Sequence, residues 1–401
     1  MAEPSNQALG GLPAADPEVA RQPQPTYKAF ADGPPAVRDE LVGVMVSSWQ
    51  SVSQTLRKPE IFSSGLAMDL QTERKVIPLM IDPPDHRKYR KILDPLFTPH
   101  RVRPMEEPVT ELANGLIDGF IDRPEIDFAR EFSVPFPSQV FLTLFGLPLE
   151  QLPQFLAWKD GAIRPHVVLK KPIGDPEVTA YQQSTADDIY GYFAALLDER
   201  ADVRRDDLLS HFLDAEVEGD RLSRNEILDI CFTFLIAGLD TVSASLECFF
   251  AYLARHPDHR RQITDHPEVI PSAVEELLRW ETPVMGVLRM AREDTEIDGC
   301  PVKAGDFVHP MVGAANLDEA EFPDAATVKL DREPNRHLSF GGGHHRCLGS
   351  HLARLELRVA LREWHRRIPD YDVAPGVELQ YSPGIRSVET FPMVLDRPQG
   401  R

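Results

Sequence analysis

The stretch that decides the fold runs from Phe340 to Gly349 and reads Phe-Gly-Gly-Gly-His-His-Arg-Cys-Leu-Gly. Consecutive glycines permit positive φ angles and let the backbone approach another group closely. The loop delivers Cys347 to the start of a predicted helix over Leu348–Ile368, where unpaired N–H groups and the helix dipole favour an anion. A thiolate is the form of cysteine that binds metals, so Cys347 is a candidate metal ligand.

Three interpretations of this loop remain open on the residues alone. The first is an iron cofactor, whose potential backbone N–H groups near the sulfur would tune. The second is zinc, which would need four ligands in tetrahedral reach. The third is a metal-free glycine turn. Zinc draws its support from the histidines that crowd around Cys347: His337, His344, His345 and His351.

The loop resembles the Phe-x-x-Gly-x-His-x-Cys-x-Gly signature of the cytochrome P450 family, the haem-thiolate monooxygenases. The residues that match are Phe340, Gly343, His345, Cys347 and Gly349. The resemblance implies that Cys347 is the iron ligand of haem b (iron protoporphyrin IX), with Phe340 and Gly349 beside it. Thiolate ligation favours cleavage of a bound O–O bond. It also implies a mainly α fold with small β-sheets (α+β), the haem lying between a long central helix and the helix after the cysteine loop.

The central helix begins at the capping box Ser223–Glu226 and continues as an apolar run to His256. We expect one buried helix of about 30 residues, long enough to cross a domain. Charged residues interrupt its apolar run, which disfavours a membrane span.

The middle of this helix carries Ala237-Gly238 and Asp240-Thr241, which resemble the oxygen-activation segment of the family. Ala237 and Gly238 would leave room beside the haem and bound dioxygen. Thr241 offers a hydroxyl and Asp240 a carboxyl that relays protons, two of which are needed to release one oxygen atom as water. Taken alone, these residues also fit a kinked structural helix.

Glu276 and Arg279 match the Glu-x-x-Arg motif of the family, and their spacing places them on one helix face. The resemblance implies a buried structural pair that holds the cysteine loop. The expected third partner lies in Asn335–His337, with Arg336 as the candidate.

The two propionates of a haem need cationic or hydrogen-bonding partners. His86 and Arg90 resemble the family's propionate segment, and Arg289 its strand arginine, with Arg292 as a competitor for that role. His345 is the fourth candidate.

The resemblance also implies a substrate pocket lined by mostly apolar side chains, which indicates a hydrophobic small molecule. Its expected residues are Thr233, Ile236, Ala237, Val284 and Val287, with the turn Gly384–Val388 adding to the wall. Arg164, His166 and Arg386 are weaker candidates for anchoring a polar substrate tail.

Length and composition bound the protein class. We expect one domain over residues 1–401, with a loosely ordered N-terminal arm over about 1–25. Four cysteines are too few for a disulfide framework. The net charge of −20 argues against nucleic acid and anionic membranes as partners, and the N-terminus carries no secretory signal, so we expect a cytoplasmic protein.

The expected activity is insertion of one atom of O2 into a hydrophobic small molecule, by hydroxylation, dealkylation or epoxidation. Because the chain shows no flavin or iron–sulfur segment, NAD(P)H electrons would arrive through a ferredoxin reductase and a ferredoxin or flavodoxin. That partner would dock on a basic proximal face built from the segments Asp85–Arg103 and His344–Arg367. The alternatives are an H2O2-driven peroxygenase, a non-enzymatic haem sensor or carrier, and a zinc-stabilised interaction protein.

Overall fold

A computed structural model describes residues 16–65, 74–217, 219–382 and 384–396. Contacts between residues divide the chain into two compact units. The first unit comprises Met1–Ser63, Pro99–Phe136 and Thr241–Arg401, and the second comprises Ser64–Thr98 and Pro137–Asp240. A single domain over residues 1–401 stays a prediction.

The described chain is mainly helical, with small sheets, as the sequence predicts. The first unit holds α2 (Pro17–Arg21), α3 (Pro23–Ala31), α4 (Trp49–Arg57), α6 (Pro99–Val102), η3 (Arg103–Met105), α7 (Glu106–Asp118), the π-helical turn η4 (Ala129–Ser133), α14 (Thr241–Arg255), α15 (Pro257–Asp265), η6 (Pro267–Val269), α16 (Ile270–Glu281), α17 (Val312–Ala315), η7 (Gly343–His345) and α18 (Ser350–Arg367). The second holds α5 (Asp85–Leu93), η2 (Asp94–Phe97), η5 (Leu149–Gln151), α9 (Leu152–Ile163), α10 (Pro165–Leu169), α11 (Pro176–Asp202), α12 (Leu208–Asp214) and α13 (Arg224–Gly238), while α8 (Pro135–Leu144) runs from the first unit into the second.

The largest sheet belongs to the first unit and has the strand order β1-β2-β10-β7-β3. Among the described strands of this sheet, β2 and β10 are parallel and the other neighbouring pairs are antiparallel. Its strands are β1 (Ala36–Asp39), β2 (Gly43–Val46), β3 (Phe62–Ser63), β7 (Arg289–Ala291) and β10 (Phe307–Pro310). Smaller sheets are formed by β11 (Asp370–Val373), β14 (Pro392–Asp396) and β4 (Glu125–Asp127), by β12 (Tyr381–Ser382) and β13 (Ser387–Val388), by β8 (Thr295–Ile297) and β9 (Cys300–Val302), and in the second unit by β5 (Glu216–Val217) and β6 (Asp220–Arg221).

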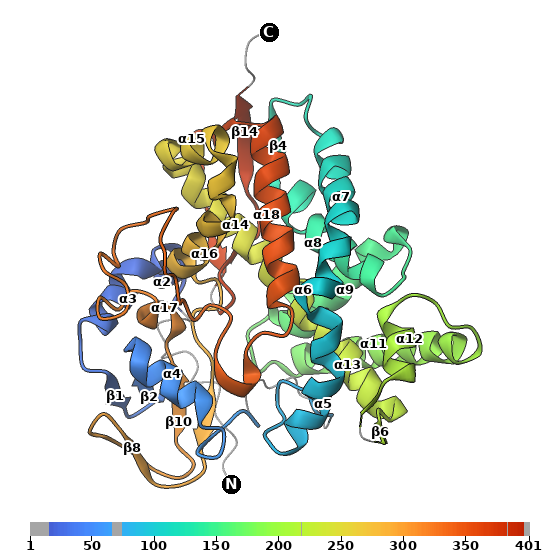
Figure 1. Ribbon diagram of the computed structural model, residues 1–401, viewed down its shortest axis with the longest axis vertical. Helices are drawn as coiled ribbons and strands as arrows, with labels where there is room; N and C mark the ends of the chain where they lie inside the picture. Colours follow the sequence, from blue (N-terminus) through green and yellow to red (C-terminus); the bar gives the residue numbers. More distant parts are fainter. Residues whose placement is uncertain (1–15, 66–73, 218, 383, 397–401) are drawn as a thin grey trace. The chain divides into compact units, whose positions relative to one another are not determined.

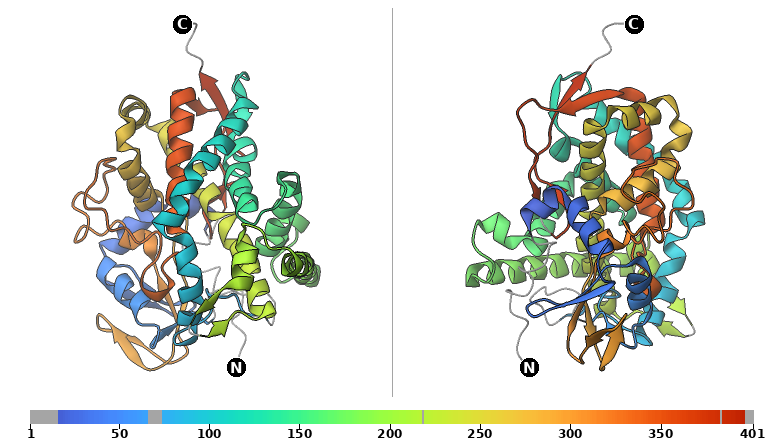
Figure 2. Two further views of the ribbon diagram at one scale, coloured as in Figure 1. Left: turned by 45° about the vertical axis from the view of Figure 1, so that its right-hand side comes forward. Right: turned by 90° about the vertical axis from the view of Figure 1, so that its left-hand side faces the viewer.

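Helix α18 follows the cysteine loop and is anchored deep in the first unit, where it packs beside α7 (Figures 1 and 2). Trp364 on α18 is completely buried. Its ring lies 5.0 Å from those of Phe128 and Phe132 and 5.1 Å from that of Phe250, measured between centroids. Such aromatic packing resists displacement, so α18 gives the loop before it a fixed end.

The predicted central helix is interrupted, which corrects the expectation of one continuous helix. The capping box is confirmed: the Ser223 N–H donates to Glu226 Oε2 (2.6 Å) and the Glu226 N–H to Ser223 Oγ (3.3 Å). Helix α13 ends at Gly238 and α14 begins at Thr241. Glycine is a poor helix former, and the Asp240 side chain is engaged in ion pairs described below, so the interruption falls at this point.

Within the described residues, Arg224–Arg255 is the one stretch long and apolar enough to cross a membrane by composition. In its most apolar window, 78% of the residues are buried. The core helix of a globular protein passes the same test, so this stretch is weak evidence for a membrane span.

The predicted loose N-terminal arm extends beyond the described part of the chain, because residues 1–15 lie outside it. Where the structure describes the arm, it is helical. Ala20 on α2 is fully buried, and its carbonyl accepts a hydrogen bond from the Arg386 guanidinium (2.5 Å). The described part of the arm is therefore packed against the rest of the first unit at Ala20.

Candidate functional site

The cysteine loop is closed on itself and seated on α4. The Cys347 N–H donates to the Phe340 carbonyl (2.8 Å). Gly341 and Gly343 have φ angles of +67° and +64°, which favour glycine. A Cβ at Gly343 would lie 2.3 Å from the Leu56 carbonyl oxygen. Glycine is thus required at 341 and 343 by the left-handed backbone, and at 343 also by the close approach of the Leu56 carbonyl. The loop leaves Cys347 exposed.

The side chains around this loop distinguish the zinc interpretation from the haem interpretation. Among the described residues, no group of three or more His, Cys, Asp or Glu side chains is placed to hold a metal ion. The zinc interpretation, which needs four protein ligands, therefore has no support in this part of the chain. A haem would fit an exposed cysteine such as Cys347, because the protein would need to supply a single thiolate to hold its iron.

Glu276 and Arg279 form a buried network, and both side chains are 0% exposed. Arg279 donates two hydrogen bonds of 2.8 Å to the Glu276 carboxylate. The third partner is Arg332, whose Nε lies 3.0 Å from Glu276 Oε2, while Asn335 adds a bond of the same length. The expected segment Asn335–His337 is confirmed through Asn335, but Arg336 as its candidate is wrong, because the Arg336 side chain is 67% exposed and lies near Glu321.

This network reaches the cysteine loop through Asn316, which the sequence analysis missed. Arg279 Nη1 donates to the Asn316 carbonyl (2.8 Å). The Asn316 side chain in turn accepts from the Leu338 N–H (2.8 Å) and donates to Ser339 Oγ (2.9 Å). Hydrogen bonds thus connect Glu276 and Arg279 to the start of the cysteine loop, which agrees with the structural role expected for this pair. Asn316 lies in no motif, so the sequence carried no signal for it.

The candidate propionate partners divide between the units. In the second unit, His86 and Arg90 lie one turn apart on α5. His86 is 2% exposed, and Arg90 Nε pairs with Asp94 (2.6 Å). In the first unit, Arg289 on β7 is 7% exposed whereas Arg292 is exposed, so the structure favours Arg289 as the inward-facing cation.

His345 also belongs to the first unit and lies in the 3-10 turn η7, where it is partly buried. Gly349 caps the start of α18, and a Cβ there would meet no atom within 4 Å.

The break between α13 and α14 carries a buried charge cluster. Asp240 is 3% exposed, and its Oδ1 accepts from Lys159 Nζ (3.1 Å) and from the Arg164 guanidinium. Arg164 therefore pairs with Asp240, and neither cation was predicted as its partner. Ala237 is exposed on a helix whose neighbouring Ile236 is buried, and a Cβ at Gly238 would meet only the Phe141 ring, at 3.5 Å. A methyl group added at Gly238 would therefore make only an ordinary van der Waals contact.

The predicted pocket residues differ in exposure. Thr233 and Ile236 are buried, and the Thr233 hydroxyl donates to the Asp229 carbonyl of its own helix (2.8 Å). Val284 and Val287 are partly exposed, and Val284 bridges to Ile385.

The structure thus brings together the two wall segments that the sequence placed far apart, Val284–Val287 and the turn Gly384–Val388. Arg386 in that turn is 3% exposed and forms a buried ion pair with Glu281. This makes Arg386 a structural residue of the first unit.

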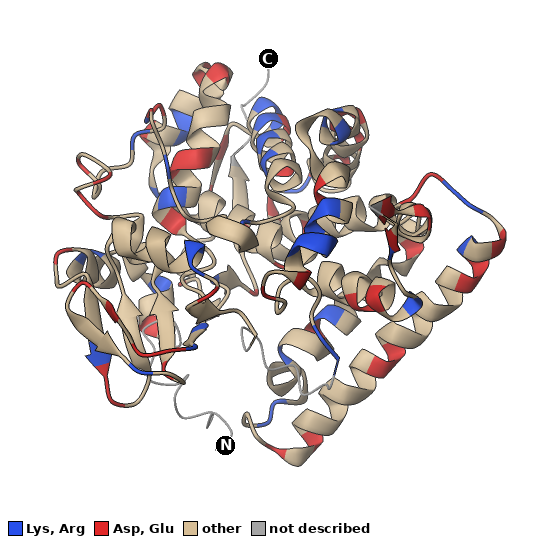
Figure 3. Cartoon of the chain, turned by 60° about the horizontal axis from the view of Figure 1, so that its bottom comes forward, with Lys and Arg blue, Asp and Glu red and all other residues tan. Residues whose placement is uncertain are grey.

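The expected basic face is largely neutralised within the first unit. Arg354 pairs with Glu275, Arg362 with Glu106, Arg366 with Glu363 and Arg367 with Asp118. Figure 3 shows acidic and basic residues close together on many helices. Charge patterns along the sequence therefore overstate how basic this surface is.

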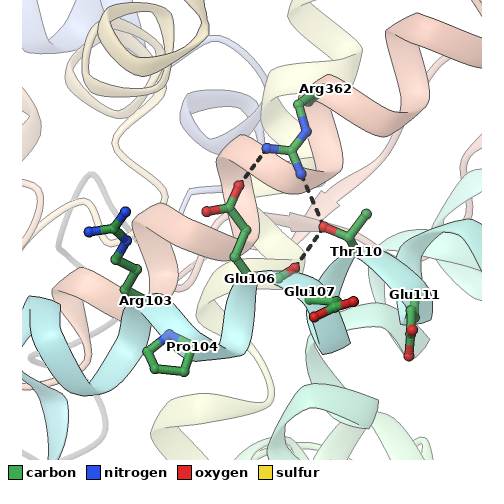
Figure 4. Close-up of a pocket in the computed structure, with 7 residues that line it drawn as sticks. All are labelled: Arg103, Pro104, Glu106, Glu107, Thr110, Glu111 and Arg362. Carbon is green, nitrogen blue, oxygen red and sulfur yellow. Dashed lines mark hydrogen bonds and ion pairs between the residues drawn. The ribbon is translucent and has the colours of Figure 1, made fainter.

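An open groove of about 720 Å³ lies between α7 and α18, with the Arg362 guanidinium bridging Glu106 Oε1 (2.7 Å) and Thr110 Oγ1 (3.0 Å) (Figure 4). Its lining is of mixed charge and includes no residue of the cysteine loop: Arg103, Pro104, Glu106, Glu107, Thr110, Glu111 and Arg362.

Comparisons with known proteins place this site in a family. The cytochrome P450 family model matches residues 42–364, and the chain belongs to that family. Mycinamicin IV hydroxylase/epoxidase of Micromonospora griseorubida is 34% identical, covering 89% of this chain and 82% of the relative. Steroid C26-monooxygenase of Mycobacterium tuberculosis H37Rv is 33% identical and covers 94% of both chains.

Solved structures agree with this assignment. The bacillaene polyketide synthase cytochrome P450 PksS of Bacillus subtilis 168 has a TM-score of 0.87 at 28% identity, covering 96% of this chain and 99% of that chain. CYP109E1 of Bacillus megaterium, in complex with testosterone, has a TM-score of 0.85 at 28% identity, covering 95% and 100%. The chain is thus an oxidoreductase of the cytochrome P450 monooxygenase family, which implies a haem-iron cofactor.

Proposed function

We propose that the protein inserts one atom of O2 into a hydrophobic small molecule and reduces the other to water, and that Cys347 would hold the iron of haem b. The observation that carries this proposal is the exposed Cys347, held on a glycine loop closed by the Cys347–Phe340 backbone bond in a chain of this family. The absorption spectrum of the reduced protein with carbon monoxide tests it. A strongly red-shifted Soret band supports a thiolate ligand, and a band typical of histidine-ligated haem contradicts it.

When bound, the haem supplies the redox chemistry that activates dioxygen. In this proposal the chain holds the propionates, contacts the porphyrin and controls protons. The residues proposed to bind the haem are His86, Arg90, Arg289, His345, Phe340, Gly349, Ala237 and Gly238. Thr241 would hold a proton on its side-chain hydroxyl beside the haem, and the Asp240 carboxyl would relay protons to that hydroxyl. We also infer a single catalytic domain over residues 1–401 and a cytoplasmic location.

The ion pairs of Asp240 give its proposed role a testable form. Its carboxylate accepts hydrogen bonds from Lys159 and Arg164, so a proton relay would require Asp240 to exchange between these cations and the Thr241 hydroxyl. We expect Asp240→Asn to reduce product formation about 10²-fold, since an amide keeps the shape but cannot relay a proton. The turnover rate with a substrate that the enzyme accepts would be measured, together with the solvent isotope effect on that rate.

Asp160 provides a matched control for this experiment. It contacts the same two cations, Lys159 at 3.1 Å and Arg164 at 3.2 Å, but its side chain is 41% exposed. Asp160→Asn should leave turnover within about twofold, because an exposed ion pair contributes little. Equal losses in both variants would refute the relay.

The alternative functions are tested on the wild-type protein. Turnover driven by H2O2 without any turnover driven by NAD(P)H would favour the peroxygenase, and no turnover by either route would favour a haem sensor or carrier.

The proposed substrate is an apolar molecule. The residues proposed to contact it are Thr233, Ile236 and Ala237 in the second unit and Val284 and Val287 in the first. Relatives support this class, because they are named for mycinamicin IV and for steroids, and a structural neighbour was solved with testosterone.

We propose that an acidic ferredoxin or flavodoxin, reduced from NAD(P)H, docks on the part of the first unit that includes Arg101 and Arg103, both of which are exposed. Arg354 and Arg358 are unsuitable as probes, because both pair with Glu275. We expect Arg101→Glu with Arg103→Glu to slow reduction by a ferredoxin about tenfold at low salt and to flatten its salt dependence.

The control for docking is the double variant Arg261→Glu and Lys303→Glu, which makes the same change in net charge at side chains 63% and 67% exposed. Stopped-flow reduction across a salt series would be compared for both variants. Equal slowing would indicate a general charge effect and would overturn the assignment of this surface.

A further inference from the structure

A second cluster of charged side chains joins α16, the cysteine loop and α18 within the first unit. Arg354 on α18 binds the Glu275 carboxylate through two bonds, Nε to Oε1 at 2.8 Å and Nη2 to Oε2 at 2.7 Å. His337 Nε2 lies 3.1 Å from Glu275 Oε2. The side chains of His337, Arg354 and Glu275 are 2%, 18% and 20% exposed. The cluster is therefore mostly removed from water, where charge-assisted bonds are strong.

The hydrogen bonds of His337 define its protonation. The Ser339 N–H donates to His337 Nδ1 (3.2 Å), so Nε2 carries the proton and donates it to Glu275. Burial lowers the pKa of His337, in keeping with a neutral ring. Burial raises the pKa of Glu275, but hydrogen bonds from His337 and Arg354 outweigh it and lower the pKa to about 2. Glu275 is thus an anion with two fixed donors.

The cluster reaches Cys347 through Phe340. The Arg354 guanidinium lies 4.3 Å from the centroid of the Phe340 ring, within the range of a cation–π contact. The Phe340 carbonyl accepts the hydrogen bond from the Cys347 N–H (2.8 Å). Arg354 thus contacts the side chain of the same residue whose backbone carbonyl accepts from the Cys347 N–H.

This cluster and the Glu276 network hold different side chains and meet only at Ser339, whose hydroxyl accepts from Asn316 and whose N–H donates to His337. Glu275 and Glu276 are neighbours on α16, yet Glu276 binds Arg279, Arg332 and Asn335 while Glu275 binds His337 and Arg354. The Glu276 side chain is completely buried and its network continues to Asn316 and Ser339. The Glu275 cluster instead holds His337 and Phe340, on either side of Leu338 and Ser339.

We propose that Glu275, His337 and Arg354 are positioning residues that hold Phe340 and thereby set the geometry of Cys347 as an iron ligand. This inference rests on the proposed role of Cys347. It assigns Arg354 to the inside of the protein, in contrast to the docking role expected from the basic sequence of α18. Loss of the cluster should weaken the thiolate ligand without abolishing the fold, because the Glu276 network remains.

The test uses the holoenzyme with Arg354→Gln, Arg354→Lys and Glu275→Gln, and Arg362→Gln as the control. Arg362 lies on the same helix and also binds a glutamate, Glu106 at 2.7 Å, but does not contact the loop. The readouts are the ratio of red-shifted to unshifted Soret band in the reduced carbon monoxide complex, the iron reduction potential and the unfolding midpoint.

We expect Arg354→Gln and Glu275→Gln to lower the Soret ratio about tenfold and to shift the potential, since each removes a charge-assisted bond. Arg354→Lys should recover part of the ratio, because it keeps the charge near Phe340, and Arg362→Gln should change neither quantity. An unchanged ratio and potential in Arg354→Gln and Glu275→Gln would overturn the inference, as would the same changes in Arg362→Gln. If the wild-type protein lacks the red-shifted band, the proposed function fails instead. Glu275→Gln is nearly isosteric and guards against a folding defect in the Arg354 variants.

Discussion

Cys347→Ser should abolish the red-shifted Soret band of the reduced carbon monoxide complex and lower monooxygenase turnover at least about 10³-fold, as loss of an essential group does. Serine has nearly the same size, so the loop should keep its Cys347–Phe340 backbone bond, which the side chain does not make. Because Cys347 is exposed, the substitution leaves no cavity in the core. The defect should therefore lie in iron ligation rather than in folding.

Cys300→Ser is the control for this result. Cys300 lies on β9 and is partly exposed, and it should tolerate serine with unchanged spectrum and turnover. Spectra, haem content and thermal unfolding would be recorded for both variants. A red-shifted band that survives in Cys347→Ser, or disappears equally in Cys300→Ser, would contradict the assignment of Cys347 as the ligand.

Arg279→Leu should destabilise the protein by about 3–5 kcal/mol, because it leaves the Glu276 carboxylate buried with one of its charged partners removed. Both side chains are 0% exposed, and Arg279 also donates to the carbonyls of Asn316 and Ala325. Domains are stable by only about 5–15 kcal/mol, so we expect low expression of folded protein and poor haem retention. Urea unfolding followed by fluorescence would measure the loss.

The matched comparison is Arg336→Ala, which removes a cation next to the same network in sequence. The Arg336 side chain is 67% exposed and 3.7 Å from Glu321, so its loss should cost less than about 1 kcal/mol. If Arg279→Leu unfolds at the same urea concentration as Arg336→Ala, the Glu276 network does not contribute to the free energy of unfolding as its burial indicates.

Local sequence patterns were sufficient where the physical cause is local. The capping box at Ser223 and Glu226 formed as expected, because its two bonds join residues three positions apart. The pair Glu276 and Arg279 formed for the same reason. The glycines before Cys347 indicated a special backbone, and Gly341 and Gly343 have positive φ angles.

Predictions failed where the partner lies far away along the chain. Arg336 and Arg332 are equally basic in the sequence, and only folding brings Arg332 to Glu276. The continuous central helix was likewise expected from an apolar pattern that does not report the ion pairs of Asp240 with Lys159 and Arg164. Arg354 was expected to face a partner protein, but Glu275 on another helix holds it.

The sequence by itself determined the class of protein, because the cysteine signature and the Glu-x-x-Arg motif are short patterns whose chemistry needs those residues at that spacing. The tertiary structure alone decided which charges are buried, which are paired and which remain exposed. Burial and pairing depend on segments that meet only after folding, and no pattern within one segment contains that information.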